Sequence, residues 1–221
     1  MTLVVGALLQ DNRYQIQAVL EETDVEIVYR AVHTYLDKSV LLRQLRGDVE
    51  WGEGERPDSR AIMVRLLRFS QCQHPCLGEI LDCFEEDGRV YMVLPTYGKL
   101  TMAHWLQTNG GVDTAELIDH LRSQDVIFDK FHQNGLVYGL LTPESLHYRA
   151  ETNELVVAAF SWRMFLADLL GDRHRLSEST AIDIQGLAHI AYRLLTGDVE
   201  SMGHPGNSVA DTDAIAERDI E

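Results

Sequence analysis

The sequence predicts an α+β protein of two lobes, in which an antiparallel-sheet N-terminal lobe with one helix precedes a mainly helical C-terminal lobe. Strand-like segments and an Asp-Gly turn fall within residues 10–95, whereas helix candidates with regularly spaced apolar residues occupy residues 98–200. A chain of 221 residues, 45% of them hydrophobic, can build one large domain or two small lobes. We place the lobes at 1–97 and 98–200, followed by a flexible acidic tail or linker at 201–221.

The clearest strand signal is the segment 82–94 (DCFEEDGRVYMVL). Its central Asp-Gly pair, flanked by apolar residues, is typical of a tight two-residue turn between antiparallel strands. The segment therefore predicts a β-hairpin at the end of the first lobe.

Four helices are expected, one in the first lobe and three in the second: 60–72, 100–107, 114–134 and 182–195. The 114–134 helix has the strongest start signal, because Asp113 is a good N-cap and Glu116 completes a capping box. Its apolar residues repeat with helical spacing and are expected to face the core: Leu117, Leu121, Phe128 and Phe131.

Composition and charge exclude several classes of partner. Asp and Glu (35 residues) outnumber Lys and Arg (19), which gives a net charge of −16 at pH 7. Nucleic acids and anionic membranes attract basic surfaces, so neither is an expected partner. The opening MTLVVGALLQ is apolar, but it is short and lacks the basic flank of a signal peptide. The expected location is the cytoplasm.

Cys72, Cys76 and Cys83 flank His74 with the spacing C-x3-C-x6-C, which raises a zinc site as one alternative. The preferred interpretation is three free thiols, because free cysteines suit a reducing compartment. The histidines are scattered, without an HExxH pattern or a similar helical pair. The sequence therefore predicts neither a metal nor another cofactor.

Residues 131–148 (FHQNGLVYGLLTPESLHY) resemble the catalytic loop of protein kinases, LHxxGIVHRDLKPENIL. In that family an aspartate accepts the proton of the substrate hydroxyl, and Leu140 stands at its position. Leucine has no lone pair and cannot act as a general base. Thr142 replaces the lysine of the pattern, and Ser145 replaces the metal-binding asparagine. The resemblance implies the frame of this loop without its chemistry.

The resemblance to bacterial-type Ser/Thr kinases extends over about residues 10–197 and implies a bilobal kinase-like fold. Residues 11–45 resemble the first three strands of that family. Residues 183–197 (DIQGLAHIAYRLLTG) are similar to its buried F helix. Residues 156–161 (VVAAFS) stand where the family has its DFG motif, which puts Ala159 at the position of a metal-binding aspartate.

The nucleotide-binding elements of the family are also altered. Residues 20–28 (LEETDVEIV) lack glycine, and we interpret the carboxylates at 21–26 as a solvated hairpin tip rather than a phosphate cradle. Arg43 replaces the lysine of the third strand and exchanges a compact ammonium for a planar fork. The family's helix glutamate that pairs with this lysine falls near Arg65, and no carboxylate occurs between residues 61 and 74. That ion pair is therefore not expected.

These substitutions predict a pseudokinase: a catalytically inactive interaction or regulatory module of cytoplasmic signalling that does not bind ATP-Mg productively. Weak nucleotide binding without metal stays open, because residues 94–97 resemble the hinge, whose backbone groups bind adenine. Two alternatives are kept. The first alternative is an atypical nucleotide-binding enzyme of this fold that uses Arg43, Glu144 or the 21–26 cluster. The second is a structural adaptor in a larger assembly.

The C-terminal lobe is expected to be truncated, because the last helices of a kinase have no counterpart and no APE signature follows residue 161. The chain is then either naturally minimal or a piece of a longer protein. A truncated lobe would expose Ile190, Leu194 and Leu195, and exposed apolar patches commonly mark interfaces. The expected partner is a protein or a fused effector domain, for example a phosphatase or a sensor module. The oligomeric state is left open.

Overall fold

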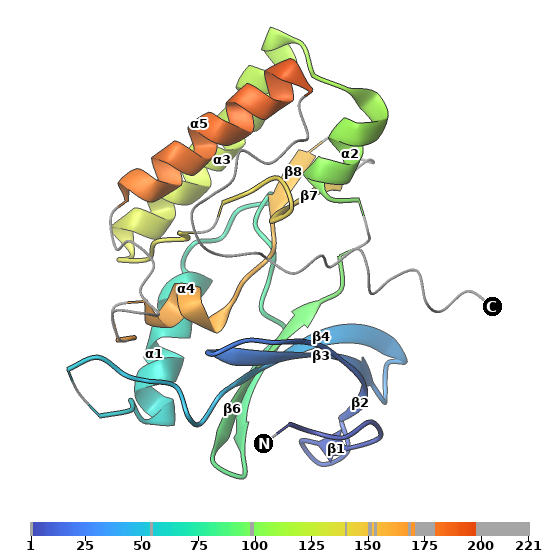
Figure 1. The fold of residues 1–221 in the computed structure, drawn as a ribbon, viewed down its shortest axis with the longest axis vertical. Helices are drawn as coiled ribbons and strands as arrows, with labels where there is room; N and C mark the ends of the chain where they lie inside the picture. Colours follow the sequence, from blue (N-terminus) through green and yellow to red (C-terminus); the bar gives the residue numbers. More distant parts are fainter. Residues whose placement is uncertain are drawn as a thin grey trace. The chain divides into compact units, whose positions relative to one another are not determined.

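The computed structural model describes residues 2–53, 55–97, 100–139, 141–149, 152, 154–167, 169–170 and 180–197. They form two compact units. The first unit takes the described residues of 1–47 and 80–96, and the second takes those of 48–79 and 97–199. The first unit is built on a β-sheet, and the second carries the helices (Figure 1). The predicted α+β class is confirmed, whereas the predicted tail at 201–221 lies outside the described residues.

The first unit is a six-stranded antiparallel sheet in the order β1-β2-β3-β4-β6-β5. Its strands are β1 (Leu8–Leu9), β2 (Tyr14–Glu22), β3 (Glu26–His33), β4 (Lys38–Leu45), β5 (Asp82–Glu86) and β6 (Arg89–Pro95). The β5–β6 hairpin turns at Asp87 and Gly88, whose φ angles are 51° and 71°. Positive φ at both central residues matches the twist of tight hairpins. The hairpin predicted at 82–94 is confirmed.

β1 is an edge strand that the sequence did not predict. Gly6 N donates to Ile16 O (2.8 Å), and Ile16 N donates to Ala7 O (2.9 Å). Leu3 N donates to the hydroxyl of Tyr29 (3.0 Å), and the side chains of Leu3 and Ala7 pack against the core. The apolar opening segment is therefore a structural part of the sheet.

An aromatic stack crosses the core of the first unit. The rings of Tyr14 and Phe84 lie 5.7 Å apart, and those of Phe84 and Tyr91 lie 5.1 Å apart. Aliphatic residues of the central strands surround this stack: Ile16, Ile27, Val40, Leu42 and Val93. Buried aromatic pairs of this kind add about 0.5–1.5 kcal/mol each beyond the burial of their area.

The second unit contains five helices and a two-stranded hairpin within the residues that the structure describes. They are α1 (Ser59–Ser70), α2 (Met102–Asn109), α3 (Thr114–Gln133), β7 (Leu146–Arg149), β8 (Glu154–Val157), α4 (Trp162–Leu166) and α5 (Ala181–Thr196). The four predicted helices are confirmed, whereas α4 and the β7–β8 hairpin were not predicted. As expected, Asp113 caps α3, because its carboxylate accepts from the N–H groups of Ala115 (2.8 Å) and Glu116 (2.9 Å). None of the described helices has the length and apolar character needed to cross a membrane.

Helix α1 was predicted in the first lobe, but the structure groups it with the second unit. Its residue Phe69 is buried, and the ring lies 4.6 Å from Phe160, 5.5 Å from Phe165 and 6.0 Å from Phe131. Phe165 belongs to α4, and Phe131 belongs to α3. This aromatic cluster is the physical reason for the grouping, because it ties α1 to three segments far along the chain.

Helices α3 and α5 run side by side in opposite directions (Figure 1). Near one end Val112 N donates to Leu194 O (2.7 Å), and near the other His132 Nε2 lies 2.9 Å from Asp183 Oδ2. Gly111 makes the first contact possible, because a Cβ there would lie 2.7 Å from the carbonyl oxygen of Leu195.

The apolar surface of α5 differs from the expectation. Ile190 and Leu194 are buried, so the prediction that they are exposed is wrong for both, whereas Leu195 is half exposed. Ile184 and Tyr192 are half exposed as well. The helix turns its 187–190–194 side toward the interior, and the exposed apolar residues lie on other sides.

Side chains of β5, at one end of the sheet, contact residues near β1, at the other end. Asp82 accepts from the hydroxyl of Tyr14 (3.1 Å) and from Arg13 Nη1 (3.3 Å). Glu86 accepts from the backbone N–H of Gln10 (2.7 Å). Because β1 and β5 are the two ends of the sheet, these contacts show that the sheet curls and that the β5 edge is partly covered.

The contact with Asp82 predicts an unusual titration of Tyr14. Burial, and then the Asp82 carboxylate, raise the pKa of Tyr14 from 10.0 to about 12. Stability from the neutral phenol is thus present below pH 10 and is lost as the pH rises through 12. Asp82→Asn should lower the pKa of Tyr14 but leave it above its ordinary value, because burial remains. Phenolate absorbance against pH, with Tyr14→Phe as the reference, measures this; ionisation of Tyr14 at its ordinary pKa in the unchanged protein would contradict it.

Candidate functional site

The segment that resembles a catalytic loop, 136–145, connects α3 to β7 in the second unit. Helix α3 ends at Gln133, and the N–H of Asn134 is satisfied by the carbonyl groups of the last turn. Gly135 and Gly139 follow with φ angles of 68° and 75°. Glycine adopts this left-handed conformation without strain, so the two glycines set the path of the loop.

A buried carboxylate fixes the backbone of this loop. Asp183, in the first turn of α5, is fully buried. One of its oxygens accepts from Gly139 N (2.7 Å), and the other accepts from Tyr138 N (3.0 Å) and lies 2.9 Å from His132 Nε2. The N-terminal end of a helix favours a negative charge, and charge-assisted bonds to N–H groups are among the stronger hydrogen bonds. Asp183 thereby joins α3, the loop and α5.

Tyr138 links the loop to the segment that follows β8. Its ring is buried and lies 5.9 Å from Phe128 and 6.4 Å from Phe131, both on α3. Its hydroxyl donates to the backbone carbonyl of Ala159 (3.0 Å). Ala159 is thus positioned by its backbone, and its methyl side chain offers no polar atom to a ligand.

Ser145 is used to close the loop on itself. Its hydroxyl donates to the carbonyl of Thr142 (2.8 Å) and accepts from the N–H of Thr142 (2.9 Å). The N–H of Ser145 also donates to the Thr142 carbonyl (3.0 Å). Because Ser145 is buried, its hydroxyl is shielded from water, and these bonds within the loop satisfy it instead. The hydroxyl therefore serves the loop, as small polar side chains commonly do in turns.

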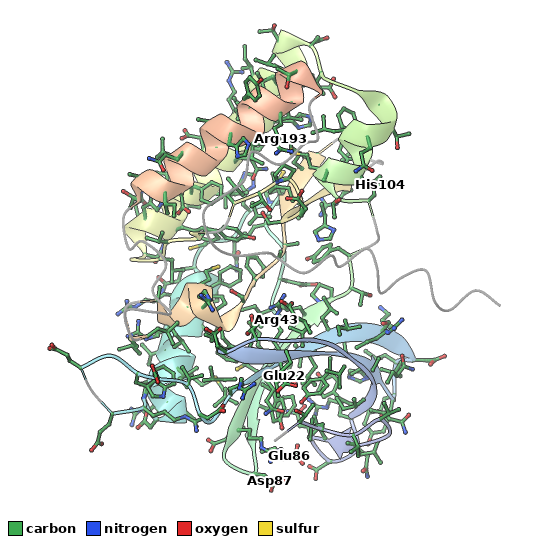
Figure 2. The ribbon with its side chains drawn as sticks, in the orientation of Figure 1. Glu22, Arg43, Glu86, Asp87, His104 and Arg193 are labelled. Carbon is green, nitrogen blue, oxygen red and sulfur yellow. The ribbon has the colours of Figure 1, made fainter. Side chains whose placement is uncertain are left out.

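Arg43 lies on β4 in the first unit and forms a partly buried ion pair with Glu26 on β3 (Figure 2 labels Arg43). Arg43 Nη1 lies 2.7 Å from Glu26 Oε1, and the two side chains are 15% and 7% exposed. The strand register explains the pairing: Arg43 is opposite Val28, and Glu26 is two residues from Val28. Side chains two residues apart share a face, so Glu26 is the diagonal neighbour of Arg43.

The hairpin tip before Glu26 is only partly solvated. Glu22 and Asp24 are exposed, but Val25 and Glu26 are buried, so the interpretation of 21–26 as a solvated tip is wrong for Glu26. Thr23 closes the turn, because its hydroxyl accepts from the N–H groups of Val25 (3.3 Å) and Glu26 (3.0 Å). The tip is thus a self-bonded turn instead of a row of free N–H groups.

A magnesium–nucleotide complex, which the resembled family implies, does not fit these residues. Magnesium prefers carboxylate oxygens, whereas Ala159 has no side-chain oxygen and its carbonyl already accepts from Tyr138. The Ser145 hydroxyl already donates one hydrogen bond and accepts another within its own loop. In the first unit, the guanidinium of Arg43 already has a carboxylate partner.

The second unit also contains a hollow of about 500 Å³ that no sequence prediction anticipated. Four carboxylates line it together with the buried ring of His120: Asp113, Glu116, Asp119 and Glu154. Burial lowers the pKa of His120, so the ring is neutral at pH 7. The hollow is therefore acidic and disfavours phosphate groups.

The structure assigns the predicted site residues to separate places. Thr142 and Ser145 are in direct contact, and Ala159 is joined to the same loop by its carbonyl. Arg43 belongs to the other unit, and Leu140 lies outside the described residues. Glu144, named for the atypical enzyme, is exposed.

Two residues that matter most were missed by the sequence prediction. Glu26 was counted with its acidic neighbours, although strand alternation places it on the face of Arg43 once the register is known. Asp183 was noted only as the start of a helix. The sequence feature that could have pointed to Asp183 is an acidic residue in the first turn of an apolar helix.

Comparison with known proteins supports a single kind of fold. No protein-family model matches the chain. The chain is 25% identical over 215 residues to the serine/threonine-protein kinase PrkC of Bacillus subtilis (strain 168), a match over 90% of this chain and 33% of PrkC. It also superposes on the crystal structure of Rad53 1-466 in complex with AMP-PNP with a TM-score of 0.63 and 15% identity. That match covers 88% of this chain and 51% of the Rad53 chain. The chain thus spans about a third of PrkC and about half of that Rad53 chain.

The anchoring role of Asp183 predicts a large loss of stability on its removal. Asp183→Ala leaves the N–H groups of Tyr138 and Gly139 buried without their acceptor, so the free energy of unfolding should fall by about 3 kcal/mol or more. Asp129→Ala is the matched control, because Asp129 is exposed on α3 and should change stability by less than about 0.5 kcal/mol. Urea unfolding followed by tryptophan fluorescence, to which the buried Trp162 contributes, measures both. Equal losses in the two variants would refute the anchoring role.

Proposed function

Because this chain belongs by its fold to the protein kinase-like superfamily, we propose that it is a non-catalytic kinase-fold module that binds and regulates a protein partner. On this proposal it does not use ATP with magnesium productively. The observation that carries the proposal is the contact between Ser145 and Thr142, in which the neutral hydroxyl at the expected metal-binding position donates to and accepts from its own loop.

The chemistry of the remaining positions supports the same conclusion. Phosphoryl transfer depends on positioning and on the electrostatic stabilisation supplied by metal ions, their carboxylate ligands and a base. The residues at those positions are Leu140, Ser145 and Ala159, none of which carries a charge or a titratable group. These three positions therefore supply no group for proton transfer and no anionic metal ligand.

The same loop is nevertheless held firmly in place. Asp183 accepts from the N–H groups of Tyr138 and Gly139, and the Tyr138 hydroxyl donates to the carbonyl of Ala159, with distances of 2.7 to 3.0 Å. A rigid loop without reactive groups is what a scaffold for binding requires, because binding surfaces on fixed backbone lose less entropy on association. This combination supports a binding role for the fold.

A protein, or an effector domain fused to this one, is the partner that we propose. The half-exposed residues Ile184, Tyr192 and Leu195 on α5 supply apolar contact area, and tyrosine is frequent in interfaces. The net charge of −16 disfavours nucleic acid and anionic membrane surfaces. A phosphatase or a sensor module in cytoplasmic signalling is the kind of effector that such a module would regulate.

An atypical nucleotide-binding enzyme is the second candidate. The similar proteins PrkC and Rad53 support it, because the first is named a kinase and the second is described in complex with AMP-PNP. Arg43 also keeps a positive charge on the sheet. A structural adaptor is a third candidate, and a stable homo-oligomer in light scattering would favour it.

Thermal unfolding with ATP separates the first two candidates. We expect no stabilisation by ATP with Mg²⁺ or Mn²⁺ beyond that seen with ATP and a chelator. A ligand at about 100 times its dissociation constant would add about 2.7 kcal/mol, which the measurement detects easily. The variant Leu140→Asp/Ser145→Asn/Ala159→Asp is the comparison, because it restores the three side chains of the family pattern. Metal-dependent stabilisation of the unchanged chain, followed by transfer of labelled phosphate to protein, would overturn the proposal.

A further inference from the structure

Helix α5 carries a second apolar face in addition to the one that packs into the second unit. Ile184 and Leu195 are half exposed, Ala188 is exposed and Ala191 is partly exposed. The intervals between these residues are four, three and four, so they lie along one side of the helix, and we call them the α5 stripe. This spacing is typical of the seam between two helices that pack along their length.

The α5 stripe and its exposed flank carry no charged side chain. Gln185 and Tyr192 are exposed beside the stripe, at positions that flank such a seam. The chain as a whole has a net charge of −16, so two copies repel one another on average. A contact along the α5 stripe brings no like charges together, and charge therefore permits a second copy at this surface.

The order of large and small side chains makes the α5 stripe self-complementary. Ile184 and Leu195 are equally far from the midpoint between positions 189 and 190, and so are Ala188 and Ala191. In an antiparallel pair of α5 helices, each isoleucine therefore meets the leucine of the other copy, and the alanines meet one another. A two-fold interface requires this reciprocity. The alanines let the helix axes come close, and the larger residues enclose them at both ends.

We propose that the α5 stripe binds a second copy of this chain, with the two α5 helices antiparallel and related by a two-fold axis. The inference rests on the proposed function, because it names the protein partner that the exposed side of α5 binds. An effector domain fused to the module would then be brought together in pairs.

The partial charges at the helix ends favour the antiparallel arrangement. Helix α5 runs from Ala181 to Thr196, and its N-terminal end carries partial positive charge while its C-terminal end carries partial negative charge. Antiparallel packing places each end beside the opposite end of the second copy, whereas parallel packing would place like ends together. A helix of an unrelated protein would gain the same dipole interaction, but only a second copy matches the large and small residues of the stripe by symmetry.

Sedimentation over a range of concentrations tests whether the dimer forms. A seam of about three turns buries less area than the roughly 1,200–2,000 Å² of standard interfaces, so we expect a weak, reversible dimer. The mass of the unchanged chain should rise from 25.0 kDa toward twice that value as the protein concentration increases. A structural adaptor would instead form a stable homo-oligomer. A mass that stays monomeric up to about 1 mM would overturn the proposal.

Two isoleucines supply a matched pair of variants. Ile184 and Ile118 are 54% and 42% exposed, and both lie near the start of a helix, where a carboxylate is tolerated. Ile184→Glu would bury an unpaired carboxylate against Leu195 of the second copy, so the dissociation constant should rise at least about tenfold. Ile118→Glu should associate like the unchanged chain, because Ile118 lies on α3, outside the stripe. Undiminished association of folded Ile184→Glu would refute the proposal.

Disulfide formation tests the antiparallel register. Ile184→Cys and Leu195→Cys, oxidised separately, should form few cross-linked dimers, because like positions lie about 16 Å apart along the axis. An equal mixture of the two variants should cross-link efficiently, since position 184 of one copy lies beside position 195 of the other. The unchanged chain, oxidised in the same way, controls for the native free thiols. Either variant alone cross-linking as well as the mixture would exclude the antiparallel pair.

These tests use neither nucleotide nor metal. Their failure therefore leaves the proposed lack of productive ATP–magnesium use standing. Metal-dependent ATP binding, in turn, would remove the proposed function without deciding whether α5 binds a second copy.

Discussion

The buried carboxylate of Asp183 is the interaction on which the second unit depends. It accepts hydrogen bonds from two consecutive N–H groups, those of Tyr138 and Gly139, and lies 2.9 Å from His132. One side chain of α5 thus fixes the end of α3 and the loop that follows it. Because a buried carboxylate is costly unless it is well bonded, this arrangement fixes the backbone at residues 138 and 139. The backbone at these two residues is held irrespective of what the other side chains of the loop can do.

Both units contain polar groups that are bonded within the fold itself. In the second unit, the hydroxyl of Ser145 is hydrogen-bonded within its own turn. In the first unit, the guanidinium of Arg43 forms an ion pair with Glu26. Each of these polar groups stands at a position that binds a ligand in the resembled family. Here each one bonds to a neighbouring residue of its own unit. Polar groups paired in this way are costly to separate, and therefore costly to recruit for a ligand.

Local signals in the sequence were sufficient for the regular elements and insufficient for their long-range pairing. The Asp87-Gly88 turn and the Asp113 cap could be predicted because their causes lie within a few residues. The partners of α1 could not, since Phe69 meets aromatic rings of segments that lie far along the chain. The resemblance located Ser145 and Ala159, but the bonds that occupy them depend on loop closure. Glu26 was misjudged because its burial follows from strand register, which composition does not reveal.

Diffraction from crystals grown with ATP and Mn²⁺ tests the central claim most directly, because anomalous scattering locates the metal without prior assumptions. The account predicts that the Ser145 hydroxyl stays bonded to Thr142, at the 2.8 and 2.9 Å seen here, with no metal peak beside it. A Mn²⁺ peak coordinated by Ser145 Oγ and by an ordered terminal phosphate would contradict the account.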